Sequence, residues 1–531
     1  MSTIDITLMH LPGLRPLSLE SCIILSAAVT VFYLANSYFV NPLSRIPSIH
    51  WSAPLSRAWY TYSLFTGPRT HMHLKAHRNL GGDAFQPVIR IGPNEVSVMA
   101  SAAIKTIYES GNFNRTNWYE AFMKWGQHIM FTFQSGQDHQ NRRRIYMKNY
   151  NRTAIFGAHC QHIIRSRSTK LLNFLLNQTS KESPTTRPFL ARNLCRALQL
   201  DVVTAFTFSD TDGTKFLDRL DSSLYNTVEE VGLEVIDLFY DERNGSYLFW
   251  EIESPFKYLI NFFSKISRES KAAHRRAESW TSGLISQFEA RYRNCKDETE
   301  RQRLVESSIY GKMLIHQPSN GSEQLRWEKR AAEILDHVGA GQENLPAVLD
   351  FVIRQLCIYP DVQEAIREEL KTLPAGIEAS AYADIEKLPY LNAVILESLR
   401  IVTVVESYQP RFVPKGGCTI EGYYLPAGTI VSSQPYLIHR QENIFPEPES
   451  FLPGRWLIED KEKKRALMKS MWAFSSGPRG CIGKDLSMAT MKIAIGYIYS
   501  HFSTQLMSEK RPKRPWEAGY AMNEVTFTSL H

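Results

Sequence analysis

The run FSSGPRGCIGKDLSMATMKIAIGYIYSHF, residues 474–502, joins a Gly-rich loop to a long apolar helix pattern and places Cys481 at the junction. A thiolate at the amino terminus of a helix faces the positive end of the helix dipole and free backbone N–H groups, which lower its pKa. Gly477 and Gly483 would let the backbone approach a flat macrocycle. Such a sulfur can ligate iron, so Cys481 is a candidate metal ligand.

The neighbours of Cys481 in the loop fit the same interpretation. Arg479 can pair with an acidic arm of a cofactor, and Phe474 can shield the sulfur from water. A phosphate-binding loop is excluded, because Lys484 is followed by Asp485 and not by the Ser or Thr that such a loop requires. The plainer alternative is a buried free cysteine in a turn, which is how most intracellular cysteines are interpreted.

The order of residues in this loop resembles a known signature. Phe-x-x-Gly-x-Arg-x-Cys-x-Gly is the haem-binding pattern of the cytochrome P450 family, and this sequence matches it at Phe474, Gly477, Arg479, Cys481 and Gly483. The resemblance implies a cytochrome P450 fold, mainly α with small β-sheets, that holds haem b through an iron bond to Cys481. It also implies a monooxygenase that inserts one oxygen atom of O2 into an apolar small-molecule substrate. NADPH-cytochrome P450 reductase, a flavoprotein, would supply the electrons.

A Glu-x-x-Arg pair upstream resembles the family's support for the cysteine loop. Glu397 and Arg400 lie one turn apart on the same face of an expected helix, although such a pair alone usually marks a solvated face. The run 444–456 resembles the family's Pro-Glu-Arg-Trp region, and Arg455 completes a Glu-Arg-Arg network. The match departs at Gly454, where the family often has Glu. The resemblance implies structural roles for these charged residues, not catalytic ones.

Two other segments resemble family contacts to the haem propionates. Arg411 lies where the family's β-strand arginine reaches a propionate. In the run SGQDHQNRRRIY, residues 135–146, His139 stands where the family often has Trp, and Arg143 lies one turn later. The resemblance implies that these three residues contact the cofactor, and it leaves the two arginines that flank Arg143 as surface or packing residues.

The run AGQEN, residues 340–344, resembles the Ala-Gly-x-Asp/Glu-Thr stretch of the family's oxygen-activating helix. Glu343 and Asn344 would then be the catalytic pair that relays protons, with Asn344 in place of the usual threonine and Pro346 loosening the helix. An amide can still donate a hydrogen bond to bound oxygen or orient a water. The departure keeps open a reductase-independent haem-thiolate isomerase or dehydratase. A third hypothesis is a non-enzymatic haem or gas sensor.

Correspondence with the family also suggests substrate contacts. These are His337 and Ala340 on the central helix, and Val404, Val405 and Tyr408 in the loop after the Glu-x-x-Arg helix. The proline-containing hinge and the run PVIRIGPNEVSV resemble filamentous-fungal members, many of which tailor secondary metabolites. The resemblance therefore implies a role in fungal secondary-metabolite biosynthesis.

Residues 1–41 are expected to form an N-terminal region with a membrane anchor, and residues 42–531 a haem-thiolate catalytic domain. From about 19 to 40 the chain carries no charge after Glu20, and this length matches the hydrocarbon core of a bilayer. A cleaved signal peptide is the alternative, although the apolar run is longer than such peptides usually carry. Basic residues are more frequent after the run than before it. We therefore expect a single-pass protein of the endoplasmic reticulum membrane, with its catalytic domain in the cytoplasm and the lipid bilayer as a partner.

Composition agrees with a folded enzyme. Hydrophobic residues make up 43% of the chain, and 61 Lys and Arg against 54 Asp and Glu give a net charge of +7, which is too modest to require a nucleic-acid partner. The seven cysteines are scattered without a Cys-x-x-Cys pair, so neither a disulfide framework nor a zinc site is indicated. Apolar periodicity predicts helices over 153–180, 215–240, 255–295, 326–370 and 383–401 and after Cys481, and β-rich segments over 87–99 and 416–433.

Overall fold

The computed structural model describes residues 18–63, 69–82, 84–179, 188–220, 265–316, 326–404, 408–510 and 522–530. The longer helices are α1 (Leu19–Ala35), α3 (Arg69–Asn79), α5 (Gly136–Tyr146), α7 (Ala158–Gln178), α8 (Ala191–Thr207), α11 (Lys265–Asn294), α12 (Glu298–Ser307), α14 (Trp327–Ile358), α15 (Pro360–Lys371), α18 (Pro389–Ile401), α20 (Lys461–Ser470) and α21 (Lys484–His501). Shorter helices are α2 (Ala58–Ser63), α4 (Ser101–Ile104), α6 (Arg152–Phe156), α13 (Ile309–Ile315), α16 (Gly376–Ala379), α17 (Tyr382–Ile385) and α19 (Pro435–Ile438). The prediction of a mainly helical chain with small sheets is confirmed.

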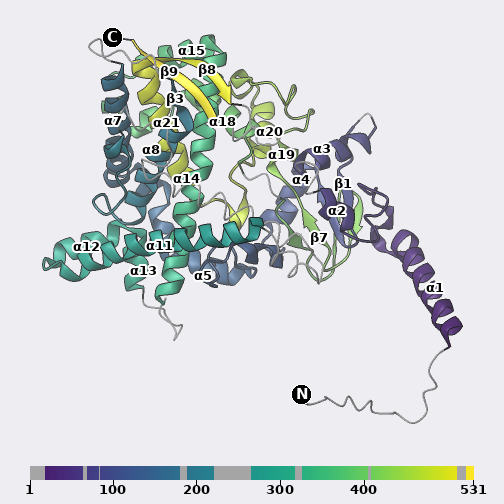
Figure 1. The fold of residues 1–531 in the computed structure, drawn as a ribbon. Helices are drawn as coiled ribbons and strands as arrows, with labels where there is room; N and C mark the ends of the chain where they lie inside the picture. The colour runs from purple at the N-terminus through teal and green to yellow at the C-terminus, as the bar shows by residue number, and fades with distance from the viewer. Residues whose placement is uncertain are drawn as a thin grey trace, which may run out of the picture.

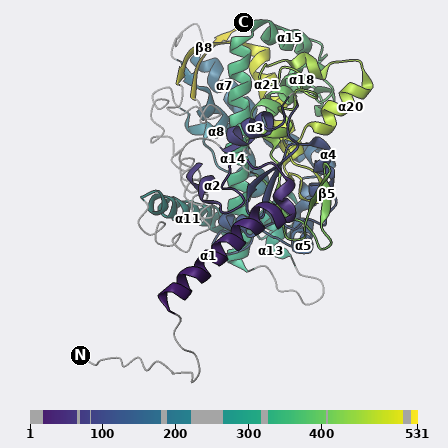
Figure 2. The ribbon, with the colours of Figure 1, turned by 90° about the vertical axis from the view of Figure 1, so that its right-hand side faces the viewer.

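The central helix α14 organises the helical part of the molecule, and it runs through the middle of the body in both views (Figures 1 and 2). Its apolar side chains recur at spacings of three and four residues, and Ile334, Val338, Val348 and Val352 are almost fully buried in the main hydrophobic core. Full burial of such a side chain contributes about 1.5–3 kcal/mol. The core also takes in α7, α8, α18 and α21, so α14 is held on several sides.

Three small sheets complete the fold. The strands are β1 (Val88–Gly92), β2 (Glu95–Val98), β3 (Phe189–Leu190), β4 (Arg411–Phe412), β5 (Cys418–Ile420), β6 (Tyr423–Leu425), β7 (Ile430–Ser432), β8 (Phe502–Lys510) and β9 (Met522–Ser529). Their orders are β1-β2-β7-β4, β3-β9-β8 and β5-β6.

The four-stranded sheet joins distant parts of the chain. The predicted hairpin over 87–99 is confirmed as the antiparallel pair β1 and β2. Strand β2 pairs in parallel with β7, and β7 pairs antiparallel with β4, so that Arg411 lies opposite Val431. A second hydrophobic cluster, which includes Val96, Val431 and Trp472, packs against this sheet. The sheet therefore joins Arg411 in β4, through β7, to strands β1 and β2, which lie more than 300 residues earlier in the sequence.

The N-terminal helix projects from the body (Figures 1 and 2). Residues Leu19–Val40 form one helical run of 22 residues with a mean hydropathy of 1.8. This run is long and apolar enough to cross a bilayer, in agreement with the predicted anchor. Three hydrogen bonds attach its carboxyl end to the body: Tyr33 Oη to the carbonyl of Leu55 at 2.5 Å, Tyr38 Oη to that of Trp51 at 2.5 Å, and Arg90 Nη1 to that of Ser37 at 3.0 Å.

Helix boundaries differ from the predicted ones where breakers occur. The predicted helix over 326–370 is two helices, because Pro360 lacks the N–H that would continue α14 and instead begins α15. Pro389 likewise begins α18 inside the predicted range 383–401. The predicted helix over 215–240 lies mostly outside the described residues.

Candidate active site

Cys481 lies in the loop that immediately precedes α21. Its backbone N–H donates to the carbonyl of Phe474 at 2.9 Å and closes the loop. Its Sγ accepts hydrogen bonds from the backbone amides of Gly483 and Lys484. The side chain is exposed, although surrounding protein desolvates the sulfur. A sulfur that is accessible within the protein interior is well placed to bind a ligand.

The pKa of the Cys481 thiol differs from the prediction. Desolvation by burial raises this pKa, and it outweighs the lowering by the Gly483 amide, Arg143 and Lys484. The expectation that the loop alone lowers the thiol pKa is therefore wrong, although the helix-terminal amides act in the expected direction. Iron binding would favour the thiolate, because a metal deprotonates a coordinating thiol.

Gly477 is required for a different contact from the predicted one. Its φ is +68°, a value that favours glycine, and a Cβ there would lie 2.4 Å from the carbonyl oxygen of Tyr108. The glycine therefore lets the cysteine loop lie against the π-helical segment Lys105–Glu109. A methyl group at Gly483 would make only ordinary contacts. Among the described residues, the close approach at Gly477 is to protein backbone, and a contact of Gly477 or Gly483 with a macrocycle stays a prediction.

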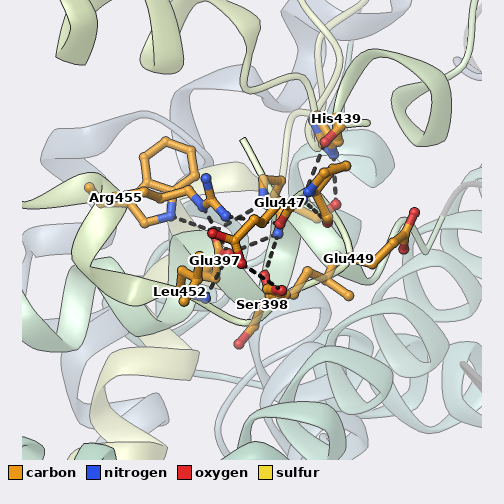
Figure 3. A network of polar contacts seen from close by, with 12 residues as sticks. Glu397, Ser398, His439, Glu447, Glu449, Leu452 and Arg455 are labelled. Atoms are coloured by element: carbon orange, nitrogen blue, oxygen red, sulfur yellow. Dashed lines mark hydrogen bonds and ion pairs between the residues drawn. The ribbon is translucent and has the colours of Figure 1, made fainter. Parts of the chain in front are cut away.

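Glu397 on α18 is the centre of a buried polar network (Figure 3). Its carboxylate accepts two hydrogen bonds from Arg400, at 3.0 and 2.8 Å, and one from Arg455 Nε at 3.0 Å. Trp456 Nε1 and the backbone N–H of Leu452 donate to it at 2.9 and 3.0 Å. The Glu397 and Arg400 side chains are fully buried, so this pairing compensates charges inside the protein. The structure thus brings the three predicted support residues together.

His439 connects this network to the cysteine loop, and sequence analysis missed it. Arg400 donates to the His439 carbonyl at 3.2 Å, and His439 Nδ1 donates to the Arg400 carbonyl at 3.0 Å. The backbone N–H of Trp472 donates to His439 Nε2 at 2.9 Å, and its carbonyl accepts from Ser475 at 3.0 Å. Burial lowers the pKa of His439 to about 3, so the ring is neutral and its one proton is on Nδ1. The network thereby positions the loop that carries Cys481.

Four arginines surround His139 on α5. His139 is buried, and its Nδ1 has no hydrogen-bond partner among the described residues. Burial, and after it the charges of Arg479, Arg115, Arg143 and Arg411, lower its pKa to about 3. Three of these arginines were predicted as cofactor contacts from three separate segments. None of the four makes an ion pair within the part of the chain that the structure describes.

Neutral groups hold the three predicted arginines. Arg479 donates to the backbone carbonyls of residues 133–135 at 2.6–2.9 Å. Arg411 donates to the hydroxyl of Tyr119 at 2.5 Å, and Arg143 donates to a carbonyl of the cysteine loop at 3.0 Å. Their positive charges are therefore oriented but not neutralised by these contacts.

Arg115 is the member of this arginine cluster that sequence analysis missed. It pairs with Arg411 in an isolated antiparallel bridge, and its guanidinium donates to the carbonyl of Phe131 and lies 4.3 Å from the ring centre of Tyr119. Burial lowers its pKa to about 9. The signal in the sequence is a lone arginine in the aromatic-rich run 112–122, which no motif distinguishes.

The donors in this region fit a haem. Arg115 and Arg411 are buried without an ion pair among the described residues, and Arg479 is half-buried beside them. Such charges are costly and call for an anionic partner, which the propionates of a haem would provide. Arg115, Arg411 and Arg479 are the residues that would hold these groups, with Arg143 and His139 beside them. The accessible thiol of Cys481 would bind the iron. Together, the charge of the arginine cluster and the sulfur chemistry match the group that the resemblance implies.

The central helix presents a small residue and an amide to the interior. Ala340 is exposed and Asn344 is half-buried, one turn apart on α14, and Asn344 Nδ2 donates to the Ala340 carbonyl at 2.9 Å. Glu343 is buried and is turned toward α8, where it forms ion pairs with Arg192 at 2.7 Å and Arg196 at 3.1 Å. A proton-relay role for Glu343 and Asn344 stays a prediction.

The suggested substrate residues lie in different surroundings. His337 is buried, and its Nδ1 is 2.7 Å from the hydroxyl of Tyr150, which lies in the segment after α5. A place for His337 in the substrate wall stays a prediction. Tyr408 is buried in an aromatic cluster, and Val404 is partly buried against the main core. Val405 lies outside the described residues. Of the suggested positions, Ala340 keeps an accessible side chain.

Comparison with known proteins agrees with this geometry. The family model for Cytochrome P450 matches residues 54–528. The cytochrome P450 monooxygenase avaI of Aspergillus versicolor is 27% identical over 420 residues, covering 76% of this chain and 91% of that protein. For cytochrome P450 monooxygenase orf2 of Aspergillus niger the identity is 25% over 516 residues, covering 96% of this chain and 95% of that protein.

The structural comparison supports the same fold. The retinoic acid-bound cyanobacterial protein CYP120A1 aligns with a TM-score of 0.62 at 19% sequence identity, covering 84% of this chain and 92% of that chain. A likeness at this identity bears on the fold alone. The family match, in contrast, extends over most of the sequence and includes the cysteine loop. The chain therefore belongs to the cytochrome P450 family of haem-thiolate monooxygenases.

Proposed function

We propose that residues 42–531 form a haem-thiolate monooxygenase in which Cys481 is the axial ligand of haem b iron. The observation that carries the proposal is the accessible Cys481 sulfur at the amino terminus of α21, together with an arginine cluster that makes no ion pair among the described residues. In this cluster Arg115 and Arg411 are buried, and Arg143 and Arg479 are half-buried. When bound, haem would supply the activation of O2 and the transfer of one oxygen atom to the substrate.

The chain's own residues would hold and orient the reacting groups. Arg115, Arg411 and Arg479 would bind the propionates through charge-assisted hydrogen bonds. The amides of Gly483 and Lys484 would moderate the charge on the axial sulfur. These contacts would hold the haem at Cys481, and Ala340 on α14 is the small residue that would accommodate O2.

Asn344 can replace the usual threonine in this arrangement. One N–H of its side-chain amide bonds to the Ala340 carbonyl, as a threonine hydroxyl would, and the other N–H and Oδ1 are left to orient a water or donate to bound oxygen. Glu343 would supply the acid of the relay.

We further propose an apolar small-molecule substrate, a place in fungal secondary metabolism and electron supply from NADPH-cytochrome P450 reductase. Support comes from the fungal relatives, which are named as monooxygenases, and from the apolar N-terminal helix, which would put the enzyme on the endoplasmic reticulum membrane beside its reductase. The catalytic domain would face the cytoplasm.

The test is the absorption spectrum of the dithionite-reduced, carbon monoxide-bound protein. Wild type and Cys418→Ser, a matched change at another partly accessible cysteine, should both give a strongly red-shifted Soret band, and Cys481→Ser should lose it. A haem-loaded Cys481→Ser protein that keeps the band would refute the assignment. Product formation that needs NADPH and reductase supports a monooxygenase, whereas turnover without them would indicate the isomerase or dehydratase.

A further inference from the structure

A buried tyrosine and histidine meet beside the cysteine loop, in a network that the proposed oxygenase mechanism does not use. Tyr150 Oη lies 2.7 Å from His337 Nδ1, and His337 Nε2 lies 4.0 Å from Oε2 of Glu333. All three side chains are buried. Tyr150, His337 and Glu333 therefore form a row that links the end of helix α5 to the central helix.

The direction of the hydrogen bond follows from the charges around the ring. Burial lowers the pKa of His337 to about 4, so the imidazole is neutral near pH 7. Its Nε2 faces the carboxylate of Glu333 and has no other partner among the described residues, which favours the tautomer with the proton on Nε2. Nδ1 is then the acceptor, and the phenol O–H of Tyr150 is the donor.

Three hydrogen bonds fix the position of the Glu333 carboxylate at the end of this row. Arg142 Nη1 donates to its carboxylate at 2.5 Å, Tyr146 Oη at 3.0 Å and the backbone N–H of Met130 at 2.7 Å. Its side chain is fully buried. A positive charge that arises on the His337 ring would therefore be stabilised by a fixed carboxylate.

Tyr150 is a neighbour of the axial sulfur. A methyl group placed at Gly483 would lie 4.0 Å from both Cys481 Sγ and Tyr150 Cε1. The phenol is thus close to the iron site on one side and bonded to a base on the other.

We propose that Tyr150 and His337 form a proton-coupled redox pair that returns an electron to the haem when a peroxide oxidises it in the absence of substrate. One electron leaves the phenol for the oxidised haem, the Oη–H bond breaks, and the proton forms a bond to His337 Nδ1. Tyr150 becomes a neutral phenoxyl radical and His337 an imidazolium facing Glu333. An electron from the NADPH-dependent flavoprotein reductase of the proposed function, together with return of the same proton, restores both residues.

A purely structural hydrogen bond would give the same geometry but no radical. The inference rests on haem binding at Cys481, so loading is verified first by the reduced carbon monoxide spectrum. The substrate-free haem protein is then mixed with a peracid, frozen, and examined by electron paramagnetic resonance. Incorporation of ring-deuterated tyrosine narrows the signal if the radical is on tyrosine.

Three variants assign the radical. Tyr150→Phe should lose the signal and bleach its haem at least several-fold faster under peroxide. His337→Gln keeps a hydrogen-bond acceptor for the phenol but cannot take the proton, and it should lower the radical yield severalfold. Tyr146→Phe, a matched change of a buried tyrosine in the same network, should keep the signal.

The outcomes separate this inference from the proposed function. A chain that cannot load haem at Cys481 would refute the proposed function and this inference with it. Loaded wild type without a tyrosyl signal, or Tyr150→Phe with the full signal, would overturn the redox pair and leave the monooxygenase assignment intact.

Discussion

Replacing Glu397 by glutamine tests whether the buried network contributes more to the stability of the fold than an ordinary surface ion pair does. The amide keeps the shape of the side chain but removes its charge, which leaves the guanidiniums of Arg400 and Arg455 without their counter-charge. A hydrogen bond to a charged group contributes about 1.5–3 kcal/mol, and breaking a buried ion pair by changing one partner costs about 3–5 kcal/mol. Since Glu397 accepts five hydrogen bonds and is fully buried, we expect a cost at the upper end of this range.

Urea unfolding of the haem-free chain, followed by tryptophan fluorescence, measures this cost. The matched control is Glu449→Gln, because Glu449 pairs with Arg440 at 3.0 Å but keeps 60% of its side chain exposed. Since the Glu449 carboxylate is mostly exposed, water screens its interaction with the buried Arg440, and this pair should contribute less than the fully buried pair of Glu397 and Arg400. Glu397→Gln should therefore lower the unfolding midpoint several times more than Glu449→Gln does, with a similar denaturant slope. Equal shifts in the two variants would refute the reasoning that burial makes this pair critical.

Three further predictions follow from the site. Arg115→Met should speed haem dissociation about tenfold or more, since it removes a charge-assisted hydrogen bond to the haem. The haem-free chain should remain at least as stable, because a buried charge is removed. Slower haem dissociation would contradict this prediction. Gly477→Ala should lower the free energy of unfolding by at least about 1–3 kcal/mol, because φ is +68° and its methyl would meet the Tyr108 carbonyl; an unchanged urea midpoint would argue against that contact. Burial holds the pKa of His73 and His439 at about 3, below the ordinary 6.5. Below pH 6.5 the unfolded chain therefore binds more protons than the folded chain, and the free energy of unfolding should decrease as the pH is lowered. The expected slope is about 1.4 kcal/mol per pH unit for each histidine, and His439→Gln should reduce it; a slope that does not change would exclude this histidine as a contributor.

Much of the fold could be predicted from the sequence because its strongest signals are local. The cysteine loop is contiguous, so the relation between Cys481 and the helix after it needs no knowledge of distant segments. The same is true of Glu397 and Arg400, which share one turn of α18. Prolines also act locally, and Pro360 and Pro389 mark helix starts that apolar periodicity alone did not separate.

The missed parts of the site depend on contacts between distant segments. Arg115 becomes a candidate only when the bridge to Arg411 brings it to the other cations. His439 connects Arg400 to Trp472 through the His439 carbonyl and the Trp472 backbone N–H. Every residue type except proline has these backbone groups, so the sequence does not indicate the contact. The contacts of His337 could not be predicted either, because spacing along a helix gives the angle between residues but not what each face meets. Glu333 lies one turn earlier on α14, but the contact with Tyr150 depends on a segment far away in sequence.

The hydrogen bonds from Tyr33, Tyr38 and Arg90 have a mechanical consequence for a membrane enzyme. A span joined to its body by a loose tether would let the body swivel, but these three bonds couple the tilt of α1 to the tilt of the body. If a bilayer holds the helix, the same side of the body will face the lipid through every catalytic cycle. Compounds dissolved in the lipid would then approach the protein by two-dimensional diffusion toward a fixed face.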